Sequence, residues 1–117
     1  MKLTQNPSEE IHDECIYLIL EREFVSNPIK VAKIGKSKCF RNRMGETRSR
    51  AHERIYPKGS KILYTSRCDN SSKSEIDLLV LFNIMFKQRK DIGLEYFEGN
   101  PNQMINQIRC YFYNQNN

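Results

Sequence analysis

The feature that most constrains the fold is a short apolar run near the N-terminus, CIYLIL at residues 15–20. Its β-branched and aromatic residues are typical of a β-strand. A second stretch, residues 31–35, alternates apolar and charged side chains and ends at Gly35. An Asn-Pro turn signal lies between the two stretches. The pattern predicts an antiparallel hairpin of two strands, residues 14–20 and 31–35.

Helix signals follow the hairpin. Ser37 can cap a helix over residues 38–50. Ser72 and Glu75 fit a capping box that opens an apolar run over residues 76–86. That run lacks Gly and Pro and is too long for an ordinary strand, so it predicts a buried helix. Asn100 followed by Pro101 is a favourable start for a last helix.

Further strands are predicted at residues 61–68 and, as a short edge strand, at 94–97. The predicted order is β-β-α-β-α-(β)-α. It indicates an α/β (α+β) fold: a small, mixed, largely antiparallel three-stranded sheet flanked by about three helices.

Length and composition predict one domain. A chain of 117 residues has room for a single core, which we place at residues 14–113, between a flexible leader (1–13) and a frayed tail (114–117). No run has the roughly 18–20 apolar residues of a membrane span, and the polar N-terminus is no secretory signal. Four cysteines without a C-x-x-C pair favour free thiols in a reducing, intracellular compartment.

Positive charge is concentrated in the middle of the chain. The net charge is +5, but residues 30–61 hold 11 of the 19 basic residues and only two acids. A dense, acid-poor basic stretch favours binding to a polyanion, although a solvated helix face has the same composition. The candidate DNA-binding residues are Lys36, Lys38, Arg41, Arg48, Arg50 and Lys58.

A nucleotide-binding loop is excluded. The sequence GKS at residues 35–37 ends like a P-loop, but Lys30 stands where that motif needs its first glycine. We therefore expect no nucleotide cofactor.

Four positions in order resemble the GIY-YIG nuclease superfamily, whose core is a small sheet flanked by helices. The sequence CIY at residues 15–17 matches the first motif and KIG at 33–35 the second. Arg43 matches the family's helical arginine, and Glu75 its metal-binding glutamate. The segments at 56–60 and 94–99 look like a branch found in phages and large DNA viruses that is often described only as DNA-binding. A viral protein in the host cell is the setting that this resemblance implies.

The resemblance implies a catalytic set of Tyr17, Lys33, Arg43 and Glu75. Tyr17 would orient or deprotonate the attacking water; a free phenol keeps its proton near neutral pH, so it would need positive charge nearby from Lys33 and Arg43. Arg43 would grip the phosphate with its planar fork. Glu75 would hold one divalent cation, Mg²⁺, as a Lewis acid.

Departures from the family pattern leave alternatives open. Cys15 and Lys33 replace a glycine and a tyrosine, which allows a non-catalytic DNA-binding module as well as a Mg²⁺-dependent endonuclease. Arg41 could share the role of Arg43, and the capping box alone could explain Glu75. Asn100 is a candidate for the family's late asparagine. A protein-interaction domain for an acidic partner has only the charge in its favour.

Overall fold

The computed structural model describes residues 14–37 and 59–115. Its elements in chain order are β1 (Cys15–Glu21), the 3₁₀ turn η1 (Arg22–Phe24), β2 (Val31–Ser37), β3 (Ser60–Arg67), α4 (Ser71–Met85), β4 (Lys87–Gln88), β5 (Tyr96–Glu98) and α5 (Pro101–Gln115). The predicted leader and the predicted helix over residues 38–50 lie outside the described residues. Neither α4 nor α5 is long and apolar enough to cross a bilayer.

The sheet is antiparallel throughout its described strands. Their order is β3-β1-β2-β5-β4, and β1 pairs with β2 as the hairpin was predicted to do, with Tyr17 opposite Gly35. The prediction of three strands is wrong, because β4 and β5 extend the sheet beyond β2. Strand β2 also continues two residues past Gly35, to Ser37, so this glycine lies inside a strand and not in a turn.

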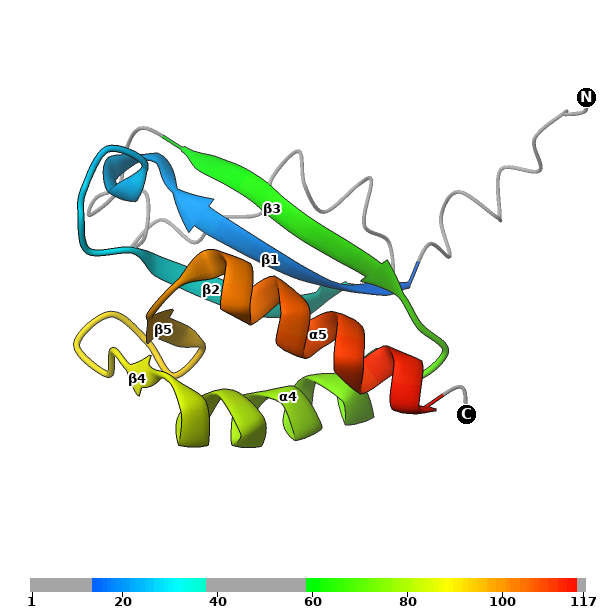
Figure 1. The fold of residues 1–117 in the computed structure, drawn as a ribbon. Coiled ribbons are helices and arrows are strands. Elements are labelled where there is room, and N and C mark those ends of the chain that lie inside the picture. Colours follow the sequence, from blue (N-terminus) through cyan, green and yellow to red (C-terminus); the bar gives the residue numbers. More distant parts are fainter. Residues whose placement is uncertain (1–13, 38–58, 116–117) are drawn as a thin grey trace, which may run out of the picture.

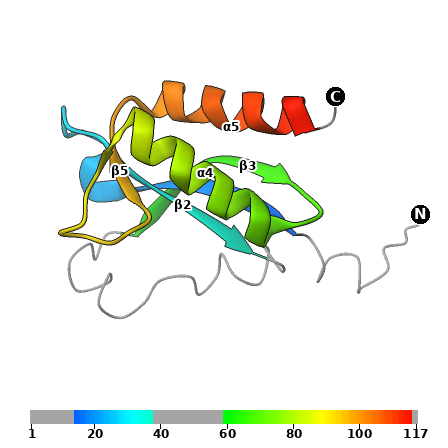
Figure 2. The ribbon, with the colours of Figure 1, turned by 90° about the horizontal axis from the view of Figure 1, so that it is seen from below.

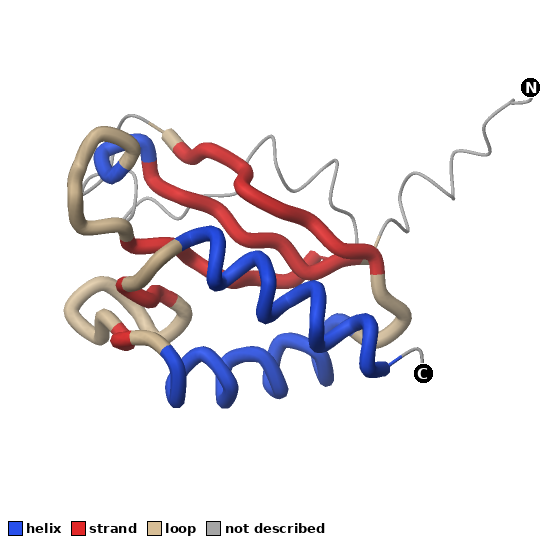
Figure 3. The backbone as a smooth tube through the Cα atoms, viewed as in Figure 1, coloured by secondary structure: helices blue, strands red, loops and turns tan. Residues whose placement is uncertain are grey.

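Both described helices pack on one face of the sheet (Figures 1 and 2), with α4 along β2 and α5 along β3. The tube view shows the same two-layer arrangement (Figure 3). Alternate residues of the strands meet the helices there. The buried core is formed by Ile16, Leu18, Ala32, Ile34, Leu78, Phe82, Phe97, Met104 and Ile108. Tyr17 and its alternate neighbours Cys15 and Ile19 form a separate buried cluster, on the opposite face.

Helix α4 departs from the prediction at its start and on its surface. The cap is Asn70, whose side chain accepts a hydrogen bond from the backbone N–H of Lys73, so the predicted Ser72–Glu75 capping box is wrong. Glu75 lies inside the helix instead. The helix is not buried all round either: the described structure exposes an apolar stripe along it, formed by Ile76, Val80 and Ile84.

Helix α5 begins as predicted. The Asn100 side chain accepts hydrogen bonds from the backbone N–H groups of Asn102 and Gln103 at 2.8 and 3.4 Å, and Pro101 occupies the first helical position. Met104 and Ile108 are buried against the sheet.

Candidate functional site

Tyr17 lies on the sheet face that the described helices leave uncovered. Its side chain is 1% exposed, and its ring lies across Gly35 of β2. A Cβ atom at Gly35 would come within 2.5 Å of the ring carbon Cζ. The glycine of the second motif therefore leaves space for the tyrosine of the first.

Lys33 approaches the same hydroxyl from β2. Because side chains alternate along a strand, Lys33 and Gly35 share a face. The Lys33 ammonium donates to the Tyr17 hydroxyl oxygen at 3.4 Å and lies 5.5 Å from the centre of its ring. The same Nζ atom is 3.5 Å from Oε1 of Glu95. The ammonium thus connects the hairpin to the segment just before β5.

Glu75 comes from α4, which borders the same edge of β2. Strand β5 pairs with β2 only over Val31–Lys33, and the ladder continues by one bond from the Ile34 N–H to the Glu95 carbonyl at 3.1 Å. The next stretch of β2 is bordered by the first turns of α4, where the Lys36 ammonium donates to Ser72 Oγ at 3.0 Å. Glu75 follows one helical turn after Ser72 and is buried.

Two carboxyl groups and two ammonium groups act on one another at this edge of β2. Burial raises the pKa of the Glu75 carboxyl, and the negative charge of Glu95, which lies within hydrogen-bonding reach of it, raises it further. Lys36 and Lys33 act in the opposite direction and lower that pKa. We call Tyr17, Lys33, Glu75 and Glu95 the edge cluster.

The structure brings together three of the four predicted catalytic residues: Tyr17, Lys33 and Glu75. Arg43 lies outside the described residues, as do the predicted DNA-binding residues Lys38, Arg41, Arg48, Arg50 and Lys58. Lys36 is described, exposed, and placed beside α4. Within residues 14–37 and 59–115, no group of three or more His, Cys, Asp and Glu side chains could hold a metal ion by itself.

Sequence reasoning missed Glu95. The sequence predicts a short edge strand at residues 94–97 but does not show which strand it pairs with. Only the pairing of β5 with β2, which places Tyr96 opposite Lys33, brings Glu95 to the ammonium. No local sequence signal could have identified Glu95, because its contact with Lys33 depends on the pairing of two strands that are distant in the sequence.

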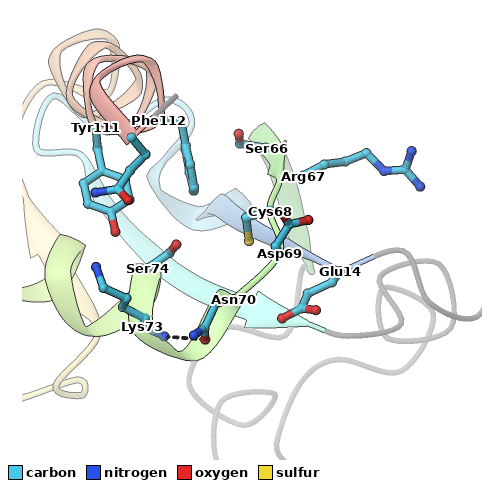
Figure 4. A pocket seen from close by; sticks show the side chains of 11 residues that line it. Glu14, Ser66, Arg67, Cys68, Asp69, Asn70, Lys73, Ser74, Tyr111 and Phe112 are labelled. Carbon is cyan, nitrogen blue, oxygen red and sulfur yellow. Dashed lines mark hydrogen bonds between the residues drawn. The ribbon is translucent and has the colours of Figure 1, made fainter. Parts of the chain in front are cut away.

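A separate pocket of about 700 Å³ lies between the end of β3 and the two helices, and none of the edge cluster lines it (Figure 4). Ser74 and Tyr111 point into it, whereas Arg67 points away. The Glu14 carboxylate already accepts the backbone N–H of Ser71 at 2.8 Å, so this helix start is occupied by the protein's own anion. Burial raises the pKa of the Cys68 thiol, which disfavours a nucleophilic thiolate here.

The described chain is a small α+β domain: an antiparallel sheet with both described helices on one face. Its polar, partly buried site lies at the edge of β2, where a tyrosine, a lysine and two glutamates come together. Comparison with known families identifies it further. The model of the T5orf172 domain matches residues 14–112, and the chain belongs to this family. The T5orf172 domain is a phage-associated domain related to nuclease-type domains. No curated protein and no solved structure gives a significant match.

Proposed function

We propose that this protein binds DNA through a GIY-YIG-type domain and hydrolyses its phosphodiester bonds with a divalent cation. One observation carries the proposal: the Lys33 ammonium contacts the Tyr17 hydroxyl and Glu95, and Glu75 lies beside them. These groups come from separate segments of the chain. Family membership supports the same reading, because the T5orf172 domain is related to nuclease-type domains.

The residues of the edge cluster suit the requirements of phosphodiester hydrolysis. The attacking water must be oriented and must lose a proton, and negative charge builds up on the phosphate oxygens. The Tyr17 hydroxyl would orient the water, and the adjacent Lys33 ammonium would stabilise negative charge on the phenol oxygen or on the phosphate. Arg43, which lies outside the described residues, would grip the phosphate as a planar fork.

The carboxylates of the edge cluster suit a hard cation. Mg²⁺ binds oxygen ligands, takes one or two carboxylates from the protein and keeps several waters. Glu75, with Glu95 in reach, offers that donor set. When bound, the cation would act as a Lewis acid on the phosphate.

Cleavage of supercoiled plasmid tests the enzyme. We expect the wild type to nick or linearise plasmid with Mg²⁺ and not with EDTA. Glu75→Gln and Tyr17→Phe should lower the rate by about 10²-fold or more, the usual effect of removing a group that assists the reaction. The control is Glu98→Gln, because Glu98 is a carboxylate paired with Arg89 at 3.2 Å that lies outside the edge cluster. Equal cleavage by wild type and Glu75→Gln would refute the proposal.

A second candidate function is DNA binding without cleavage. It is favoured by the contacts of Lys33, which replaces the tyrosine of the second motif: its ammonium already has both a hydroxyl and a carboxylate as partners. In that case the wild type leaves plasmid intact but binds it, with an affinity that falls steeply as salt rises. Charge reversal at Arg48 and Arg50, in the basic stretch outside the described residues, should weaken binding to all sequences. A flat salt dependence would argue against DNA binding of either kind.

A further inference from the structure

Glu95 occupies a central position in the edge cluster, and its contact with Lys33 gives it a role apart from any in holding a cation. Its carboxylate is 3.5 Å from the Lys33 ammonium and within hydrogen-bonding reach of Glu75. Through Lys33 it is one contact away from the Tyr17 hydroxyl. It thus contacts Lys33 directly and acts on the carboxyl group of Glu75, two of the predicted catalytic residues.

The backbone holds Glu95 in place. Its carbonyl accepts the N–H of Ile34 at 3.1 Å. The next residue, Tyr96, is buried and lies opposite Lys33 in the sheet. The main chain at Glu95 is therefore held beside β2, one residue along from the pair that Tyr96 forms with Lys33, and from there the carboxylate reaches the Lys33 ammonium.

The Lys33 ammonium needs a counter-charge. The Lys33 side chain is only 16% exposed, whereas that of Glu95 is 37% exposed. A largely buried ammonium is unfavourable unless it is paired and hydrogen-bonded. The Tyr17 hydroxyl supplies a hydrogen-bond acceptor but no charge, and Glu95 supplies the charge.

We propose that Glu95 is a positioning residue, which holds the Lys33 ammonium at the Tyr17 hydroxyl. Its importance for DNA cleavage rests on the proposed function, but the positioning itself does not. Without the carboxylate, the flexible four-carbon stem lets the ammonium turn toward Glu75 or toward solvent. The Tyr17 hydroxyl then loses the Lys33 ammonium as a neighbour.

Nuclear magnetic resonance of protein carrying ¹³Cζ-labelled tyrosine tests the positioning directly. Tyr17→Phe identifies the Tyr17 resonance, and Lys33→Met shows where it moves when the ammonium is gone. We expect Glu95→Gln to shift the Tyr17 resonance in the same direction as Lys33→Met does. Glu95→Asp should restore part of the wild-type position. The double variant Lys33→Met with Glu95→Gln should show the same shift as Lys33→Met alone. The resonance of Tyr111, whose hydroxyl donates a hydrogen bond to Asp77 of α4, reports that the fold is intact.

Glu98→Gln is the control for loss of a carboxylate from a neighbouring ion pair. A Tyr17 resonance that stays at its wild-type position in Glu95→Gln but moves in Lys33→Met would overturn the proposal. A shift of the same size in Glu98→Gln would overturn it too, because the change would then not depend on Lys33.

DNA cleavage provides the functional measurement. If the wild type cleaves, Glu95→Gln should lower kcat by about ten- to a hundredfold, as displaced catalytic groups do, with little change in KM. An unchanged kcat would overturn a role in the reaction. If the wild type does not cleave, the proposed function fails, whereas the resonance of Tyr17 still decides whether Glu95 positions Lys33.

Discussion

The ring of Tyr17 lies against the backbone of Gly35 so closely that no other residue fits there unchanged. A Cβ atom at Gly35 would be 2.5 Å from the ring carbon Cζ and 2.6 Å from the hydroxyl oxygen. Backbone conformation is not the cause, because Gly59 is the only described glycine with a positive φ. The requirement for glycine comes from the neighbouring strand, where Tyr17 is directly opposite in register.

Gly35→Ala should displace the Tyr17 ring. We expect a loss of about 1–3 kcal/mol in the free energy of unfolding, the usual cost of overpacking a buried site, together with reduced DNA cleavage. Urea unfolding gives the first quantity and a plasmid assay the second. In a Tyr17→Leu background the ring is absent, so Gly35→Ala should lower the free energy of unfolding by much less. Additive effects of the two substitutions would contradict a direct contact.

Glu75→Gln should change how stability depends on pH. The folded protein holds the proton of Glu75 more tightly than the unfolded chain does, since burial and Glu95 raise its pKa above the ordinary 4.5. At pH values between the ordinary pKa of the unfolded chain and the raised pKa of the folded protein, the native state binds more protons than the unfolded state. The stability of the wild type therefore falls as pH rises through that interval. The stability of Glu75→Gln relative to wild type should therefore grow with pH above about 4.5 and then level off. Urea unfolding at a series of pH values measures it.

Lys36→Met provides the matched variant for this pH dependence. The Lys36 charge lowers the pKa of Glu75, so its removal should raise that pKa further and extend the interval over which stability falls. A relative stability of Glu75→Gln that is independent of pH would show that Glu75 is not buried beside Glu95.

Much of the fold could be predicted because its signals are local. The hairpin follows from apolar runs on either side of a turn, and the start of α5 follows from Asn100 and Pro101. Tyr17, Lys33 and Glu75 could be named from their order along the chain. Glu95 could not, because its proximity to Lys33 depends on the pairing of β5 with β2, a long-range contact that no local pattern encodes.

The start of α4 shows the same limit at shorter range. Asn70, Ser71 and Ser72 are all residue types that cap helices, and a capping box favoured Ser72. In the structure the cap is Asn70, and the Glu14 carboxylate, just before β1, accepts the Ser71 N–H at this helix start. The helix start thus includes a contact between distant segments, which no local pattern encodes, and Glu75 has no capping role.

Tyr111→Phe should weaken the attachment of α5 to α4. The Tyr111 hydroxyl donates to Asp77 Oδ2 at 2.6 Å, and Lys73 binds the same oxygen at 2.8 Å. The hydrogen bonds from Lys73 and Tyr111 lower the pKa of Asp77 below 3.8, so the unfolded chain binds the proton more tightly. The stabilisation is complete above about pH 4 and is lost as the carboxylate is protonated in acid. The difference in unfolding free energy between wild type and Tyr111→Phe should shrink over that range, and Asp77→Asn should remove its pH dependence.

Two substitutions on α4 distinguish the helix that the sequence predicts from the one in the structure. A helix buried all round would lose stability wherever a large apolar side chain is truncated. In the structure Phe82 is fully buried between Phe86 and Phe97, whereas the Ile84 residue is 78% exposed. Phe82→Ala should cost about 3–5 kcal/mol, and Ile84→Ala should stay within about 0.5 kcal/mol of wild type. Urea unfolding of dilute protein measures both, and a cost of several kcal/mol at Ile84 would mean that the stripe formed by Ile76, Val80 and Ile84 is covered in solution.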